Sequence, residues 1–65
     1  MEVKKYPIRL GQFLKMADIV SDGNEAKIII SEGIVLINGQ VDFRRGRKLV
    51  KGDIVQVKNN IYLCS

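Results

Sequence analysis

The sequence has no histidine, one cysteine and one proline among its 65 residues. Without histidine, the side chain that most often acts as a general base near neutral pH is missing. Cys64 has no second cysteine for a disulfide and no histidine with which to share a metal. We therefore expect Cys64 to be a small, buried or half-buried apolar residue in a reducing environment. Together with the lack of a glycine-rich phosphate loop, these absences predict a protein that is not an enzyme and has no metal or cofactor.

Long apolar runs are also missing, and the longest are far too short to span a bilayer. No signal peptide is recognisable, so the sequence predicts a cytoplasmic protein without a membrane partner. The length fits a single domain over residues 1–65, which would bury only about 60% of the surface of its unfolded chain. A core of that size leaves little room for a deep pocket, so no small-molecule substrate is expected.

Acidic residues are scarce in the second half of the chain. Residues 1–33 hold five cations and five acids, whereas residues 34–65 hold six cations and only Asp42 and Asp53, so the whole net charge of +4 lies in the second half. Between those two acids stand Arg44, Arg45, Arg47, Lys48 and Lys51. With so few acids nearby, we predict that these cations are not engaged in internal salt bridges. A one-sided excess of this kind predicts a surface that binds a polyanion, with nucleic acid as the leading candidate.

The basic run is also compatible with roles that involve no nucleic acid. A run of charged residues is often simply a solvated surface. The guanidinium group of arginine, however, can donate two hydrogen bonds to one phosphate, a geometry that solubility alone does not require. Alternatively, the run docks on an acidic protein surface. Duplex DNA is less favoured than RNA, because no helix carries the cations at the spacing of a major groove.

Two short helices are predicted in the first half, after an extended segment over residues 3–8 that Pro7 restricts to a sheet edge. The first helix has apolar residues at i, i+3, i+4 and i+7: Leu10, Phe13, Leu14 and Ala17. The second follows a polar loop over residues 18–24 and turns Ala26, Ile29 and Ile30 inward. Asp22 and Glu25 have the spacing of a capping box, and Gly33 suits the left-handed position after a helix. Capping therefore accounts for the closest pair of carboxylates better than acid–base catalysis does.

Strands are predicted beyond Gly33. Residues 34–37 resemble a buried strand, and Asn38-Gly39 suits a type I′ turn because both residues tolerate positive φ. In the returning strand Val41 and Phe43 alternate with polar residues, and we expect Phe43 in the core of the hairpin.

Further turn signals divide the rest of the chain. Gly52-Asp53 predicts a turn in which the aspartate bonds its own backbone, and Asn59-Asn60 predicts a turn between strands over residues 54–58 and 61–64. The fold class is therefore α+β, with two short helices packed on a small, mostly antiparallel sheet of four to five strands.

Base stacking receives little support from the sequence. Phe13 is needed by the first helix and Phe43 by the hairpin, and nothing places Tyr6 and Tyr62 on a common platform. Recognition would then depend on backbone charge and shape, which suits folded RNA.

The order of motifs resembles the S4 RNA-binding domain. The shared pattern is A-x-x-(I/L)-I-x-x-G-x-V-x-(V/I)-N-G, matched by Ala26, Ile29, Ile30, Gly33, Val35, Ile37, Asn38 and Gly39 and followed by Gly52-Asp53-Ile54. Arg9-Leu10 and Phe13-Leu14 match its first helix, so the resemblance covers nearly the whole chain. The stand-alone YaaA/YbcJ-type small proteins are the more similar group, through Glu25-Ala26-Lys27 and the run Arg44-Arg45-Gly46-Arg47-Lys48-Leu49.

In this family the two helices and the hairpin, the αL motif, form the RNA-contacting surface. The resemblance therefore implies that Arg9, Lys15 and Lys27 join the hairpin cations in binding RNA. Many S4 domains carry Ser-Arg where this chain has Asp22-Gly23, which removes an RNA-facing arginine from the second helix and shifts weight to residues 44–51.

These observations predict a monomeric protein that contacts structured RNA, ribosomal RNA or an assembling ribosomal particle. Arg44, Arg45, Arg47 and Lys48 are predicted to grip phosphates, with Lys51 and Lys27 extending the track and Arg9 and Lys15 at its edge. Reversing Arg44, Arg45 and Arg47 to glutamate is expected to abolish binding and leave the domain folded. The alternative function is a protein-interaction adaptor, which predicts an exposed apolar patch beside the cations.

Overall fold

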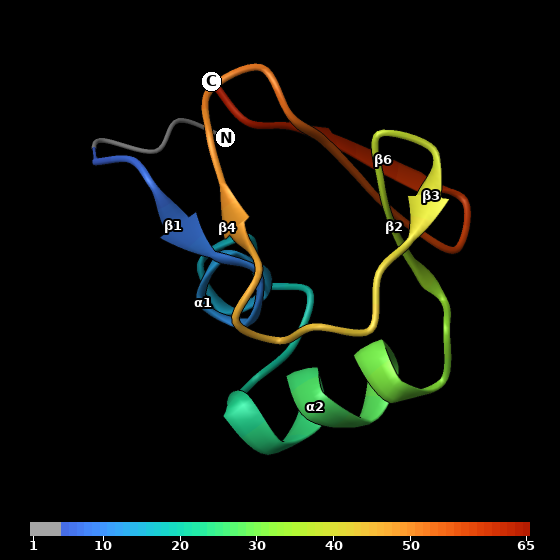
Figure 1. Ribbon diagram of the computed structural model, residues 1–65. Coiled ribbons are helices and arrows are strands. Elements are labelled where there is room, and N and C mark those ends of the chain that lie inside the picture. Colours follow the sequence, from blue (N-terminus) through green and yellow to red (C-terminus); the bar gives the residue numbers. More distant parts are fainter. Residues whose placement is uncertain (1–4) are drawn as a thin grey trace.

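The computed structural model describes residues 5–65, so part of the extended segment expected over residues 3–8 lies outside them. Two helices and two antiparallel sheets confirm the α+β fold class (Figure 1). The elements are β1 (Ile8–Arg9), α1 (Leu10–Met16), α2 (Gly23–Ser31), β2 (Val35–Ile37), β3 (Gln40–Val41), β4 (Lys48–Leu49), β5 (Ile54–Val57) and β6 (Asn60–Leu63). The strands form a four-stranded sheet in the order β3-β2-β5-β6 and a separate pair, β1-β4.

Helix α1 begins without a side-chain cap. Arg9 occupies the cap position, and its side chain makes no capping hydrogen bond. The first amide groups of the helix, which have no partner within it, donate instead to carbonyls of a distant loop: Leu10 N to Arg47 O at 2.7 Å and Gly11 N to Arg45 O at 3.0 Å. The start of α1 is therefore completed by tertiary structure.

Helix α2 is bounded as its sequence predicts. Oδ1 of Asp22 accepts a hydrogen bond from the backbone N–H of Glu25 at 2.9 Å, and Gly33 has a φ of +75°. The returning bond of the capping box differs by one residue, because Oε1 of Glu25 accepts from the N–H of Ser21 and not from that of Asp22.

The β2-β3 hairpin has the predicted turn, with φ of 52° at Asn38 and 85° at Gly39. This two-residue turn pairs Ile37 with Gln40 and Leu36 with Val41.

The β5-β6 turn differs from the prediction. It uses Lys58 and Asn59, since Val57 pairs with Asn60 and Lys58 has a φ of 57°. The turn expected at Asn59-Asn60 is therefore displaced by one residue. At Gly52-Asp53 the prediction is confirmed, because Oδ2 of Asp53 accepts from the N–H of Val50 at 3.0 Å.

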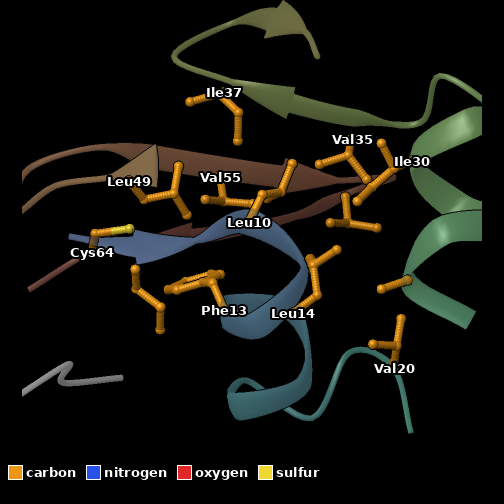
Figure 2. Packing of buried hydrophobic residues seen from close by; sticks show 13 residues of the cluster. Leu10, Phe13, Leu14, Val20, Ile30, Val35, Ile37, Leu49, Val55 and Cys64 are labelled. Carbon is orange, nitrogen blue, oxygen red and sulfur yellow. The ribbon is translucent and has the colours of Figure 1, made fainter. Parts of the chain in front are cut away.

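The core lies between the helices and one face of the four-stranded sheet. Leu10, Phe13 and Leu14 of α1 pack toward Val35 and Val55 of the sheet (Figure 2). Cys64 is buried as predicted, and burial raises the pKa of its thiol. Every large side chain of this cluster is apolar, so its burial stabilises the fold through the hydrophobic effect.

The opposite face of the sheet is mostly apolar, and four of its large apolar side chains are exposed. The strand register aligns Val41, Leu36, Gln56 and Ile61 in one row across the sheet, with Ile54 and Leu63 paired beside it. Ile61 is 67% exposed and Leu63 55%. We call these six residues the outer sheet face.

Candidate nucleic-acid interface

Residues 42–47, here called the basic loop, connect β3 of the four-stranded sheet to β4 of the two-stranded sheet. In Figure 1 this segment leaves β3, passes the start of α1 and enters β4, which pairs with β1. At its tip the N–H of Arg47 donates to the carbonyl of Arg44 at 3.1 Å, closing a turn around Arg45 and Gly46. The carbonyls of Arg45 and Arg47 then accept from the first amides of α1. The backbone of the loop is therefore held at both its tip and its end.

Asp42 organises the other side of the basic loop. It is 5% exposed, the one buried charged residue in the described part of the chain. Its Oδ1 accepts from the backbone N–H of Arg44 at 2.8 Å and from Nε of Arg44 at 3.2 Å. Its Oδ2 accepts from Nη2 of Arg44 at 2.9 Å and from Nη1 of Arg47 at 2.7 Å. Both carboxylate oxygens are thus fully used.

This cluster holds Asp42 ionised. The hydrogen bonds from Arg44 lower the pKa of Asp42 well below its usual range, and the bond from Arg47 adds to them against the opposing effect of burial. The same carboxylate raises the pKa of Arg44. Asp42, Arg44 and Arg47 together carry a net charge of +1.

The prediction that the basic run has no internal salt-bridge partners is therefore wrong for Arg44 and Arg47. One acid suffices for both because it is buried where two guanidinium groups can reach it. Reversing Arg44 and Arg47 to glutamate would surround this buried carboxylate with like charge, so these two reversals are expected to destabilise the fold as well as to change the surface charge.

A shallow groove of about 450 Å³ lies where α1, the start of α2 and the tip of the basic loop meet. Three predicted cations from separate segments line this basic groove: Arg9, Lys15 and Arg45. None of its lining residues is acidic, and none of the three forms an ion pair among residues 5–65. Gln12 and the backbones of Gly11, Gly23 and Gly46 complete it. The groove combines positive charge with neutral hydrogen-bonding groups.

Glycine at position 11 makes room for Arg45. A Cβ atom on residue 11 would lie 2.8 Å from Cγ of Arg45, closer than such atoms approach one another. The side chain of Arg45 therefore crosses the helix at a point where only glycine fits without displacing it.

The remaining predicted cations lie around this arrangement. Lys48 pairs with Arg9 across β4 and β1, which places it beside the groove. Arg44 and Arg47 border a second hollow of about 300 Å³ next to Asp42. Lys27 on α2 and Lys51 before β5 are exposed but do not line the basic groove. Arg9 and Lys15, expected at the edge of the track, are thus within the groove.

Phe43 is placed opposite to expectation. It is 65% exposed, whereas the alternation of the returning strand predicts it in the hairpin core. The turn causes the inversion, because pairing Leu36 with Val41 puts both on the outer sheet face. Alternation then turns Asp42 inward and Phe43 outward. Four polar or aromatic residues of the candidate site were missed by sequence reasoning: Gln12, Gln40, Asp42 and Phe43. The strand register fixed by the Asn38-Gly39 turn was the signal for Asp42 and Phe43.

Residues 5–65 contain no cluster of three or more histidine, cysteine, aspartate or glutamate side chains arranged to hold a metal ion. Among the same residues no helix is both long and apolar enough to cross a membrane.

A family model of the S4 domain matches residues 1–64. The chain therefore belongs to the S4 domain family, as the motif from Ala26 to Gly39 predicts. The probable ribosome maturation protein RlbA of Bacillus subtilis (strain 168) is 53% identical to it over 51 residues, which cover 78% of this chain and 72% of that protein.

Proposed function

We propose that this protein is a non-enzymatic RNA-binding protein, a monomeric single domain over residues 1–65 that acts in the cytoplasm without a cofactor. Its target would be structured RNA, specifically ribosomal RNA in an assembling particle. Membership of the S4 family supports RNA as the ligand, and the name of the Bacillus relative, a probable ribosome maturation protein, supports the ribosomal setting.

The basic groove is the observation on which this proposal rests. Arg9, Lys15 and Arg45 come from three segments and converge on one hollow without an acid in its lining. Like charges brought together in this way repel one another, so their convergence favours a polyanion that compensates them. The proposal gives these three residues the main phosphate contacts.

The other cations take supporting roles in the proposal. Lys48 would extend the track from Arg9 along β4, and Lys27 and Lys51 would add long-range attraction. Arg44 and Arg47 would reach phosphate only with the N–H groups that Asp42 leaves unused. Asp42 would thus fix their orientation while reducing their net charge, and each would contribute less than Arg45.

The test compares two charge reversals of equal size, Arg45→Glu in the basic groove and Lys58→Glu in the β5-β6 turn. Affinity for ribosomal RNA fragments is measured by fluorescence anisotropy at one low salt concentration. Arg45→Glu is expected to weaken binding about tenfold or more, the equivalent of one charge-assisted hydrogen bond. Lys58→Glu should lower affinity only slightly, through net charge. Equal losses for both variants would show that the groove is not the interface.

Protein docking is a second candidate function, and the outer sheet face favours it. Monomeric domains seldom leave so many large apolar side chains together in solvent. Co-sedimentation with ribosomal particles across a salt series separates the two functions. Contacts through RNA phosphates weaken steeply as the salt concentration rises, whereas docking through apolar side chains persists. Ile61→Ser leaves the basic groove intact, so it should abolish apolar docking without affecting RNA binding.

A further inference from the structure

Phe43 is the most exposed aromatic side chain in the described part of the chain. Phe13 is fully buried, and Tyr6 and Tyr62 are partly buried. Phe43 stands at the exit of β3, inside the basic loop and directly before Arg44. A large apolar ring in such a charged segment costs free energy in water unless something covers it.

The Phe43 ring packs against a defined part of the backbone. A Cβ atom on Gly33 would lie 3.3 Å from Cε1 of Phe43 and 3.8 Å from Cγ1 of Val41, so the ring edge rests above the end of α2. The backbone on either side is held as well, by the bond from the N–H of Asp42 to the carbonyl of Val35 and by that from the N–H of Arg44 to Oδ1 of Asp42. Phe43 is thus presented by a fixed backbone.

The hollow beside this ring contains the groups that a nucleotide needs. It measures about 300 Å³, at the small end of the range of ligand sites. Phe43 supplies an aromatic surface, and Gln40 supplies an amide that both donates and accepts. Arg44 and Arg47 supply positive charge, and the Arg44 side chain is 72% exposed. Asp42 keeps these two guanidinium groups in place next to the ring.

We infer that this hollow binds one unpaired nucleotide of the RNA, with its base stacked on Phe43 and its phosphate at Arg44 and Arg47. Gln40 lies where it can pair with the edge of the base. This inference rests on the proposed function and specifies its ligand: structured RNA with a bulged or looped-out nucleotide beside a helix, in which the helix follows the basic groove. The Asp42 cluster then belongs to a nucleotide subsite.

The experiment uses two RNA hairpins that differ only by one unpaired adenosine in the stem. Binding of each hairpin is measured at low salt with the wild-type protein, Phe43→Ala and Phe43→Tyr. The wild type and Phe43→Tyr are expected to prefer the bulged hairpin. Phe43→Ala should lose about 5- to 100-fold in affinity for the bulged hairpin, the range for removing one base–aromatic stack, and keep its affinity for the other. Ile61→Ala, another exposed apolar truncation, serves as the matched control and should change neither.

Phe43→Trp provides a second and direct readout. The chain contains no tryptophan, so this variant would carry a single indole at the subsite. Titration with the bulged hairpin should quench its fluorescence, because a stacked base is in van der Waals contact with the indole; the hairpin without the bulge should leave it nearly unchanged.

The outcomes separate this inference from the proposed function. Equal affinity of wild type and Phe43→Ala for the bulged hairpin, or a loss shared by both hairpins without quenching, would overturn the nucleotide subsite alone. Quenching by a protein of the ribosomal particle in place of RNA would also overturn it. If the wild-type protein bound neither of the two hairpins nor ribosomal RNA, the proposed function itself would be overturned.

Discussion

Two sets of cations that look alike in the sequence differ in their surroundings. Arg44 and Arg47 share the buried carboxylate of Asp42, whereas Arg9, Lys15 and Arg45 converge on a groove without an acid. The first set helps to hold the loop, because the shared acid fixes the orientation of both arginines and reduces their combined charge to +1. The second set keeps its full charge toward solvent. Neighbouring arginines in one run thus have different physical tasks.

Hydrogen bonds on two sides hold the shape of the basic loop. Asp42 fixes the side next to the sheet through four hydrogen bonds. The amides of Leu10 and Gly11 fix the tip. Between these anchors Arg45 is presented to the groove by a backbone that is held on both sides, which would lower the entropy cost of the proposed RNA binding.

Removing the acid from the first set should have the largest effect. Asp42→Asn is expected to lower the free energy of unfolding by about 1–3 kcal/mol, since it replaces the charged acceptor of four partly buried hydrogen bonds with a neutral amide. Urea denaturation at pH 7 measures the loss. Glu32→Gln, at an exposed acid, is the control and should stay within about 0.5 kcal/mol of wild type.

Wild type and Asp42→Asn should also differ in how their stability depends on pH. The folded state lowers the pKa of Asp42 from its ordinary value of 3.8, so its stabilising contribution is complete above that value and is lost as the pH falls below it. The gap in stability between the two proteins should therefore be constant from neutral pH down to about pH 5 and narrow below about pH 4. A gap independent of pH across this range would mean that the ionised carboxylate is not what stabilises the loop.

Displacing Arg45 without changing any charge should have an intermediate effect. Gly11→Ala would put a methyl carbon 2.8 Å from Cγ of Arg45, so the Arg45 side chain has to shift, and its guanidinium group shifts with it. RNA affinity is expected to fall about three- to fivefold, or roughly 1 kcal/mol, while the melting temperature stays close to that of wild type because alanine favours the helix. Gly46→Ala serves as the matched control, because its added Cβ atom would meet nothing within 4 Å and displaces no side chain.

Neutralising the outlying cations should have the smallest effect. Lys27→Gln and Lys51→Gln remove charges that lie outside the groove lining. Each should reduce the slope of log affinity against log salt by clearly less than the roughly 0.7–0.9 of one full phosphate contact. If Lys27→Gln reduced this slope by the amount expected for a full phosphate contact, the interface would have to include the exposed surface of α2 around Lys27.

Much of the fold could be predicted because its signals are local. The cap at Asp22, the positive φ of Gly33 and the Asn38-Gly39 turn follow from the conformational preferences of single residues, and all three are present. The pairing of β1 with β4 could not be predicted in this way. It joins residues some forty positions apart, and nothing in either short segment identifies the other.

For the candidate site, the sequence indicates which cations could take part but not how they are arranged. The cations themselves are visible in the sequence, but the partners of Arg44 and Arg47 depend on the burial of Asp42, which depends in turn on the register of the hairpin. That register places Ile37 opposite Gln40, so turn length decides which residues of the returning strand face inward. The alternation of apolar residues alone predicts Phe43 in the hairpin core, whereas its side chain is exposed.

The salt dependence of RNA binding tests the central claim most directly. Affinity for ribosomal RNA is measured across a salt series for wild type, for the triple variant Arg9→Gln, Lys15→Gln, Arg45→Gln, and for Arg44→Gln. If the unpaired cations hold the phosphates, the triple variant should lose about 2–3 from the slope of log affinity against log salt, and Arg44→Gln clearly less than one contact's share of about 0.7–0.9. An unchanged slope in the triple variant, with the loss found in Arg44→Gln, would contradict the account.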